Sequence, residues 1–127
     1  GTCTPEALVD LALATGLGAL ALTDHDGLYG AARFYRTAKE REIHPILGSE
    51  LTLEGEHHLV LLAENRTGYA NLCRLLTRTH MDSPREDPRL PLSALLERSE
   101  GLILLTGCRR SPVWAEPWRV WQSWKRR

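Results

Sequence analysis

The sequence lacks the features that mark membrane, secreted or strongly charged proteins. Its 127 residues include 16 Lys or Arg and 16 Asp or Glu, and this zero net charge excludes a globally basic nucleic-acid binder, though not local basic patches. No apolar run approaches the ~18 residues of a membrane helix, and the N-terminal residues lack the basic and apolar regions of a signal peptide. The three cysteines are an odd number without a C-x-x-C pair. We therefore expect no disulfide framework and a location in the reducing cytoplasm.

Several catalytic signatures are also missing. The sequence contains no G-x-G-x-x-G, no phosphate-binding P-loop and no G-x-S-x-G, so it carries no signal for a dinucleotide fold, a nucleotide triphosphatase or a serine hydrolase elbow. A Cys–His nucleophilic pair would need a spatial proximity that the sequence does not reveal. The composition, with 43% hydrophobic and 25% charged residues, is that of an ordinary globular domain.

Helix and strand patterns alternate along residues 1–110. Thr4, Pro5 and Glu6 form a typical helix start, because a hydroxyl cap, a first-turn proline and an early carboxylate all favour it. The patterns predict helices over residues 5–15, 29–41, 68–79 and 92–98, and strands over residues 19–22, 43–53, 58–63 and 102–105. Pro45 and Gly48 are expected to break the second strand.

This alternation predicts an α/β fold with parallel strands, either an open sheet or a βα-barrel. A complete barrel takes ~200–250 residues. A chain of 127 residues would supply about half of one.

Potential metal ligands follow three of the predicted strands. Asp24 and His25 come after the first strand, Glu50 after the apolar part of the second, and Cys108 after the last. Imidazole, carboxylate and thiol groups bind zinc, manganese or iron. His58 lies at the start of its strand and fits this arrangement less well. Other interpretations stay open, since Asp24 could cap the following turn, His25 and Glu50 could be surface groups, and Cys108 could be a small apolar residue.

Four sequence blocks, in this order and spacing, resemble a known family. They are ALTDHDGLYGA at residues 21–31, PILGSELTL at 45–53, HLVLLAENRTGYANLCRLLTRTH at 58–80 and EGLILLTGC at 100–108. Together they resemble the polymerase-and-histidinol-phosphatase (PHP) domain at the N-terminus of bacterial C-family DNA polymerase III alpha subunits, above all the error-prone branch. The resemblance runs over residues 4–110, and we assign residues 1–110 to a partial PHP domain.

The resemblance implies an incomplete PHP-type (β/α)7 barrel with divalent metals in its cleft. In related domains this centre hydrolyses phosphoesters or acts as a 3′–5′ exonuclease, and in others it is inert. It implies that His25, Glu50, His58 and Cys108 are metal ligands, with zinc or manganese as the preferred ions. It implies catalytic roles for Asp24, His25 and Glu50, with Asp24 supporting the histidine beside it.

Two departures from the family pattern limit what the chain is expected to do. No H-x-H pair and no late Asp-x-His pair occurs in the sequence, so we expect no complete trinuclear centre and no turnover from this chain alone.

The alternatives to a metal-dependent polymerase module are a non-catalytic module that braces a polymerase and a free-standing PHP phosphoesterase. The implied partners are DNA and other polymerase domains, with no membrane. An incomplete barrel would also leave strand edges unpaired, which favours self-association.

Residues 111–127 form a segment of different composition. All four tryptophans lie there, and residues 109–127 contain six basic residues and one acidic residue. We consider three interpretations: sequence from a shifted reading frame or a chimeric end, a segment that binds single-stranded nucleic acid, and an interfacial amphipathic helix with its tryptophans on one face.

Overall fold

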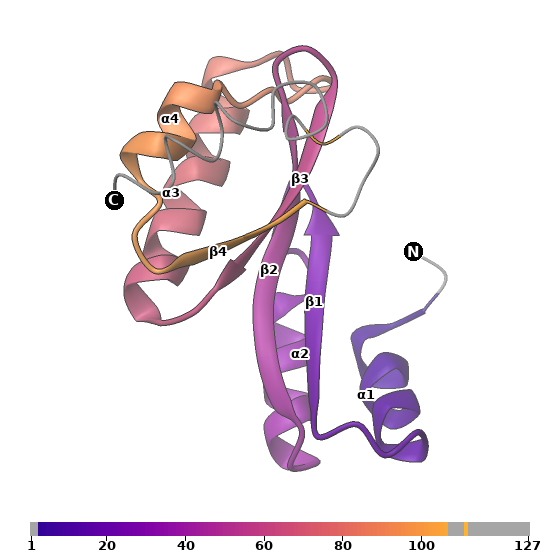
Figure 1. Cartoon of the computed structure of the whole chain (residues 1–127). Coiled ribbons are helices and arrows are strands. Elements are labelled where there is room, and N and C mark those ends of the chain that lie inside the picture. The colour runs from indigo at the N-terminus through magenta and orange to yellow at the C-terminus, as the bar shows by residue number, and fades with distance from the viewer. Residues whose placement is uncertain (1–2, 107–110, 112–127) are drawn as a thin grey trace.

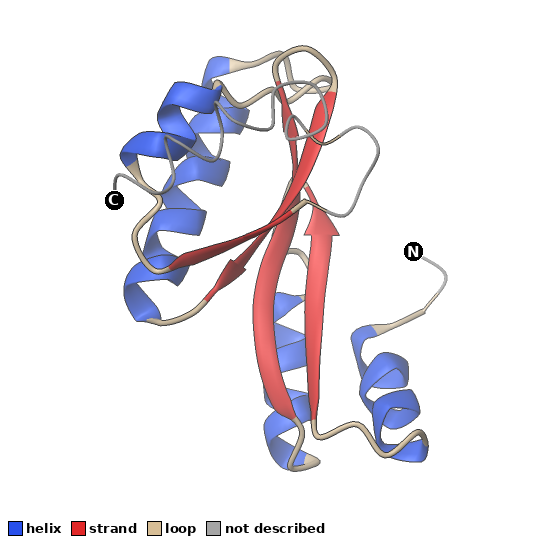
Figure 2. Cartoon of the chain, viewed as in Figure 1, coloured by secondary structure: helices blue, strands red, loops and turns tan. Residues whose placement is uncertain are grey.

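The residues that the structure describes form four helices and a four-stranded sheet (Figure 1). The computed structural model describes residues 3–106 and residue 111. The elements are α1 (Pro5–Ala14), β1 (Ala19–His25), α2 (Ala31–Glu40), β2 (His44–Leu53), β3 (His57–Ala63), α3 (Arg66–Asp82), α4 (Leu92–Glu97) and β4 (Leu102–Leu105). The sheet order is β1-β2-β3-β4, and Figure 2 separates its strands from the surrounding helices. The predicted α/β class is confirmed.

The expectation that all strands run parallel is wrong for two of the three strand pairs. β1 and β2 are parallel and are joined through α2, whereas β2–β3 and β3–β4 are antiparallel. The helix-containing crossover that parallel neighbours need takes about a dozen residues, and only residues 54–56 separate β2 from β3. Gly55 and Glu56 make this tight turn with φ values of 78° and 62°.

The second antiparallel pair has a different cause. α3 and α4 together return the chain to the point where β3 ends, and the Glu64 amide there donates to the Gly101 carbonyl at 2.9 Å. β4 then starts opposite the last residue of β3, because Leu102 pairs with Ala63. It therefore runs back along β3.

β1 is longer than the sequence pattern predicts, and β2 is continuous where breaks were expected. β1 continues to His25, because the last three residues of β1 pair with consecutive residues of β2 up to Glu50. β2 passes through both Pro45 and Gly48 without a break. Gly48 is needed where it lies, since a Cβ atom there would overlap the Leu61 carbonyl of the neighbouring strand.

α1 and α2 pack together against the first part of the sheet. α1 begins as predicted, with the Thr4 hydroxyl accepting from the Ala7 amide at 3.2 Å and proline in the first turn. Val9 of α1 and Phe34 of α2 are fully buried in the cluster that these helices form. None of the described helices is long and apolar enough to cross a membrane.

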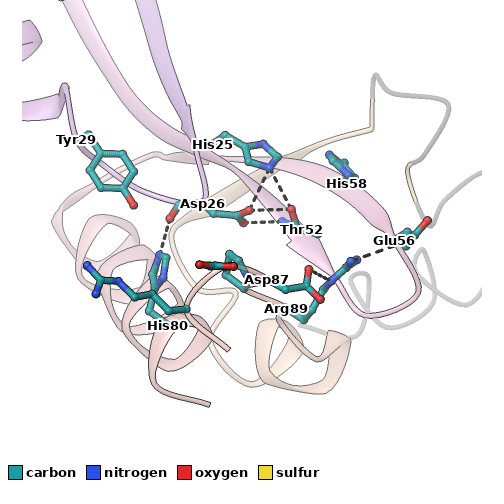
Figure 3. Close-up of a pocket in the computed structure, with 12 residues that line it drawn as sticks. His25, Asp26, Tyr29, Thr52, Glu56, His58, His80, Asp87 and Arg89 are labelled. Carbon is teal, nitrogen blue, oxygen red and sulfur yellow. Dashed lines mark hydrogen bonds and ion pairs between the residues drawn. The ribbon is translucent and has the colours of Figure 1, made fainter. Parts of the chain in front are cut away.

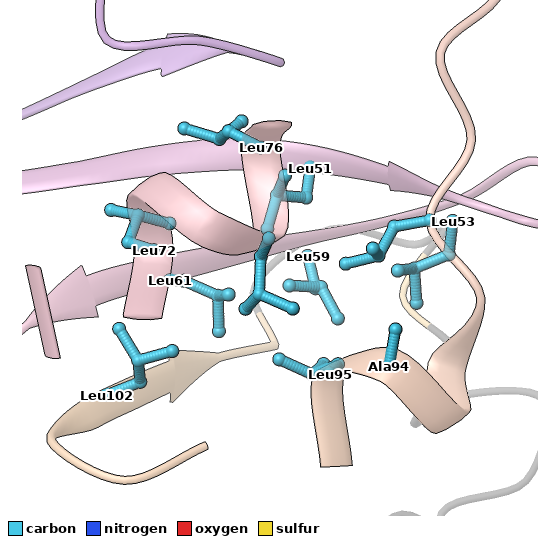
Figure 4. Packing of buried hydrophobic residues seen from close by; sticks show 11 residues of the cluster. Leu51, Leu53, Leu59, Leu61, Leu72, Leu76, Ala94, Leu95 and Leu102 are labelled. Carbon is cyan, nitrogen blue, oxygen red and sulfur yellow. The ribbon is translucent and has the colours of Figure 1, made fainter. Parts of the chain in front are cut away.

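A second core, rich in leucine, lies between α3, α4 and the other part of the sheet (Figure 4). Leu51 and Leu61 from the strands and Leu72 and Leu75 from α3 have no exposed surface. Each buried leucine contributes about 1.5–3 kcal/mol to folding. This cluster therefore fixes β2, β3 and β4 relative to α3.

The strands present two different faces. The strand residues that pack in the two cores all belong to one side of the alternation, here called the helix-covered face: Leu20, Leu22, Leu47, Leu51, Leu53, Leu59, Leu61, Leu102 and Leu104. Their chain neighbours point to the opposite side, here called the open face: Ala19, Ala21, Thr23, His25, Ile46, Gly48, Glu50, Thr52, His58, Val60, Leu62, Ile103 and Leu105. Ile103 and Leu105 remain 45% and 43% exposed.

Candidate metal centre

Three candidate ligands meet on the open face where β1 and β2 end. His25 is the last residue of β1, and its register partner on β2 is Glu50. His58 lies near the start of β3, opposite Thr52, two residues after Glu50 on the same face. Because β3 is antiparallel to β2, its beginning lies at the end of the sheet where β1 and β2 finish. The position of His58 at a strand start, which did not suit a parallel sheet, therefore suits this one.

Glu50 lies between the two imidazole rings. Its Oε2 is 3.3 Å from His25 Nδ1, and its Oε1 is 3.6 Å from His58 Nδ1. The ring centroids of the two histidines are 5.4 Å apart. One ligand atom from each of the three residues lies within 4.8 Å of the other two.

These distances and donor types fit a divalent metal ion. Ligand atoms bound tetrahedrally at about 2.0–2.2 Å from zinc lie about 3.3–3.6 Å apart, which matches the two nitrogen–oxygen distances. An ionised carboxylate is an acceptor only, so the unprotonated nitrogen of a neutral imidazole faces Glu50 favourably when a cation lies between them. The side chains of His25 and Glu50 are 53% and 35% exposed, which leaves the group accessible from solvent.

The other ring nitrogen of His25 faces a buried polar pair (Figure 3). His25 Nε2 is 3.1 Å from Asp26 Oδ2 and 3.2 Å from Thr52 Oγ1. The Asp26 carboxylate accepts from the Thr52 amide at 2.7 Å and from the Thr52 hydroxyl at 2.8 Å. Asp26 and Thr52 are only 5% and 8% exposed. Both nitrogens of His25 therefore have defined neighbours.

Asp24 is hydrogen-bonded to the loop that follows β1. Its Oδ2 accepts from the Gly30 amide at 2.7 Å, so this carboxylate holds the loop that leads into α2. None of the contacts described for Asp24 reaches the His25 ring. Cys108 and the tryptophan-rich segment after Ser111 lie outside the described residues.

Sequence reasoning missed three polar residues of the site. Asp26 stands inside the DHDG block, and only the register of β1 against β2 shows that its carboxylate meets Thr52. His80, at the end of α3, brings its Nε2 to 2.7 Å from the Asp26 carbonyl oxygen, although 54 residues separate the two. Asp26 follows His25 directly in the sequence, but this position does not predict its contact with Thr52, and no short-range signal pointed to His80.

A pocket of about 430 Å³ opens beside two of the three candidate ligands (Figure 3). His25 and His58 line one part of it, and Arg85 and Arg89 line another. Arg89 forms ion pairs inside the pocket wall, with Nε at 2.8 Å from Asp87. Glu56 and Glu86 also line the pocket, so its wall carries charged groups of both signs.

Comparisons with known sequences agree on one family. The sequence profile of the PHP domain matches residues 1–115. An error-prone DNA polymerase of Symbiobacterium thermophilum is 45% identical to this chain, over 89% of this chain and 12% of that protein. An error-prone DNA polymerase of Mycobacterium tuberculosis is 42% identical over 89% of this chain and 11% of that protein. The DNA polymerase III subunit alpha of Chlamydia pneumoniae is 39% identical over 77% of this chain and 9% of that protein.

The chain thus spans no more than 12% of the length of these curated relatives. Two solved structures are also similar to it. One, from Bifidobacterium adolescentis, is described as a metal-dependent phosphoesterase and has a TM-score of 0.51 and 25% identity, covering 64% of this chain and 29% of that one. The other, an amidohydrolase from Chromobacterium violaceum with bound sulfate and no metal, has a TM-score of 0.52 and 32% identity, with the same coverage of 64% and 29%. The resemblance indicated by the four sequence blocks is confirmed.

Proposed function

The chain belongs to the PHP domain family, and on that basis we propose that it forms the metal-binding module of an error-prone DNA polymerase III alpha subunit. The observation that carries the proposal is the convergence of His25, Glu50 and His58, from three different strands, on one accessible point of the open face. Metal dependence is a property of the family and of the solved phosphoesterase to which the chain is similar. In this chain His25, His58 and Glu50 would supply two imidazoles and a carboxylate to such a metal ion.

We assign zinc or manganese as the ion. Mixed nitrogen and oxygen ligands suit these ions better than magnesium, which prefers oxygen alone. Cys108 is the fourth ligand that the resemblance implies, and a thiolate in that place would favour zinc. The assignment of Cys108 rests on the sequence resemblance.

The chemistry of the family suggests phosphoester hydrolysis at this centre. A divalent ion of this kind activates water and stabilises charge that develops on the oxygens of a phosphoester. Of this chain's own residues, His25 and Glu50 would hold the ion and would therefore lie next to the phosphoester. Asp24 would support them through the loop that it holds with Gly30.

The polymerase context supplies the proposed partners. The relatives named above are DNA polymerases, so DNA and other polymerase domains are the partners that we propose, and the cytoplasm is the proposed compartment. Within this scheme residues 1–110 form the PHP unit and residues 111–127 a separate segment.

The chain by itself is expected to show no phosphoesterase or exonuclease turnover. Its sequence has no H-x-H pair, so a multinuclear centre requires ligands from outside these residues. Each electrostatic contact missing from the transition state costs about 2.7–4 kcal/mol, and two such losses lower the rate by about four to six orders of magnitude. Metal-dependent release of nucleotides from a DNA 3′ end, abolished by His25→Ala, would contradict this expectation.

The absence of the H-x-H pair supports a second candidate function, because a module that only braces the polymerase needs no complete catalytic centre. A free-standing phosphoesterase is less well supported, because the matches at 39–45% identity are polymerases. Metal binding separates the proposed metal-binding module from the bracing module. A bracing module needs no bound ion.

The experiment is a measurement of metal content after loading with zinc or manganese and dialysis. We expect close to one ion per wild-type chain, and a large loss in His25→Ala, Glu50→Ala and His58→Ala. His44→Ala is the matched control, because His44 is an exposed histidine at the opposite end of β2. Equal metal content in all variants would contradict the metal centre.

A further inference from the structure

The backbone and the side chain of Asp26 are both held by hydrogen bonds. It adopts a left-handed backbone conformation with φ 48°, which few residues other than glycine adopt. Its amide donates to the Glu50 carbonyl at 2.7 Å, and its own carbonyl accepts from His80 Nε2 at 2.7 Å. Its carboxylate accepts two hydrogen bonds from Thr52. Aspartate adopts this conformation more readily than most residues other than glycine, and these four hydrogen bonds hold its carboxylate beside His25.

The contact between Asp26 and His25 has a defined proton arrangement. The Asp26 carboxylate accepts from the Thr52 amide and hydroxyl, so it has no proton to give to the imidazole. Two carboxylates compete for the ring proton, Asp26 at 3.1 Å from His25 Nε2 and Glu50 at 3.3 Å from Nδ1. Asp26 is buried and Glu50 is 35% exposed to solvent, so water weakens the contact with Glu50 more than the contact with Asp26. In a neutral ring the proton therefore stays on Nε2, and Nδ1 is left unprotonated.

We propose that Asp26, held in place by Thr52, is a positioning residue that fixes His25 in the tautomer able to bind a divalent cation through Nδ1. The inference rests on the proposed metal centre and adds the group that prepares its first ligand. A carboxylate on the distal nitrogen fixes both the tautomer and the ring orientation of a metal-binding histidine. Asp26 does so from a buried site, where water competes little for the contact.

Asp26→Asn tests this role because it keeps the shape of the side chain and reverses one hydrogen bond. The Thr52 amide can only donate, so it selects the oxygen of the new amide group. The amide nitrogen then occupies the Oδ2 position beside His25 Nε2, where it can only donate. Nε2 must accept, and the ring proton moves to Nδ1, the atom needed for the metal.

The first measurement uses the metal-free 127-residue chain. Nitrogen-15 NMR of the imidazoles, at a pH where they are neutral, should show His25 protonated on Nε2 in the wild type and on Nδ1 in Asp26→Asn. The same tautomer in both proteins would overturn the inference. This outcome does not depend on whether the chain binds metal.

The second measurement is zinc affinity by isothermal titration calorimetry. We expect Asp26→Asn to bind zinc about 10–100-fold more weakly than the wild type. The control is Ser49→Ala, because the buried Ser49 hydroxyl accepts from the Gly27 amide and donates to the Asp24 carbonyl in the same loop but does not contact the His25 ring. Ser49→Ala should lower the zinc affinity less than Asp26→Asn does, because it leaves the contact between Asp26 and His25 in place.

A second variant covers the case in which Asp26→Asn does not fold. Thr52→Val keeps the shape of the residue and removes the hydroxyl that contacts both Asp26 and His25. A loss of zinc affinity greater than that of Ser49→Ala supports the inference, and equal affinities overturn it. A wild-type chain that binds no cation contradicts the metal centre, and the tautomer measurement then still decides the role of Asp26.

Discussion

The helix-covered face and the open face of the sheet use the same strands for different purposes. Leu51 is fully buried in the leucine core, while its neighbours Glu50 and Thr52 point to the open face and contact histidines. Because successive side chains of a strand point to opposite faces, a residue that stabilises the core and a residue of the metal site can be direct neighbours in the chain. If this separation is real, substitutions on one face should leave the property of the other face unchanged.

The largest effect is expected from Leu61→Ala on the helix-covered face. Leu61 has no exposed surface and packs in the leucine core. A Leu→Ala change at such a site lowers the free energy of unfolding by about 2–5 kcal/mol, which chemical denaturation of the metal-free chain can measure.

Ile103→Ala is the matched control on the open face. Ile103 lies on the adjacent strand, opposite Leu62, and is 45% exposed. Its truncation should cost much less than that of Leu61. Equal losses of unfolding free energy would show that both faces contribute alike to the core.

The next effect is expected from Glu50→Gln, which tests the open face. The substitution keeps the shape of the side chain and removes the charge between the two histidines. We expect zinc affinity to fall by more than about 100-fold, or about 2.7 kcal/mol, since a ligand itself is altered. The unfolding free energy of the metal-free chain should change by about 0.5 kcal/mol or less, and a loss as large as that of Leu61→Ala would contradict the separation of the two faces.

A smaller effect is expected at the edge of the sheet. Among the described residues β1 pairs with β2 alone, and Ala21 in β1 is exposed. If two copies associate through this edge, Ala21→Lys places one lysine on each copy, and an opposed pair of like charges costs roughly 0.2–1 kcal/mol. Analytical ultracentrifugation should then show a dimer dissociation constant about 1.4- to fivefold higher than in the wild type, and an unchanged constant would exclude pairing through β1.

The smallest effect concerns pH and the contact between α1 and α2. A backbone hydrogen bond at the start of α1, with a further contribution from Arg33, lowers the pKa of Glu6 below its ordinary value of 4.5. A carboxyl group whose pKa is lower in the folded state stabilises the fold above that ordinary value, and the stabilisation is lost as the pH falls through the folded value. Glu6→Gln should therefore lower stability slightly at neutral pH, and this loss should shrink as the pH falls below 4.5, with no change in zinc affinity. A loss that stays equal from neutral to acidic pH would contradict this origin.

Local signals in the sequence predicted the elements better than their pairing. The start of α1 follows from Thr4 and Pro5, whose cap and fixed φ act within one turn. The direction of β3 depends on a three-residue connection around Gly55. The alternation of helices and strands along the rest of the chain led instead to the expectation that all strands run parallel. The continuity of β2 through Gly48 depends on the close approach of β3, a tertiary contact that no pattern within β2 contains.

The candidate ligands divide in the same way. His25 and Glu50 could be proposed from their positions after strands, whereas His58 was assigned from the family resemblance, since its place at a strand start makes sense only once β3 is antiparallel. Asp26 and Thr52 were not identified, because their contact requires the register between β1 and β2. Short-range chemistry was therefore readable from the sequence, and contacts across strands were not.

The most direct test of the account is the position of a bound ion on the open face. Anomalous diffraction from crystals of the zinc-loaded chain should show one zinc ion about 2.0–2.2 Å from Nδ1 of His25, Nδ1 of His58 and a carboxylate oxygen of Glu50. A structure in which this point holds no zinc, or in which zinc binds Nε2 of His25, would contradict the account.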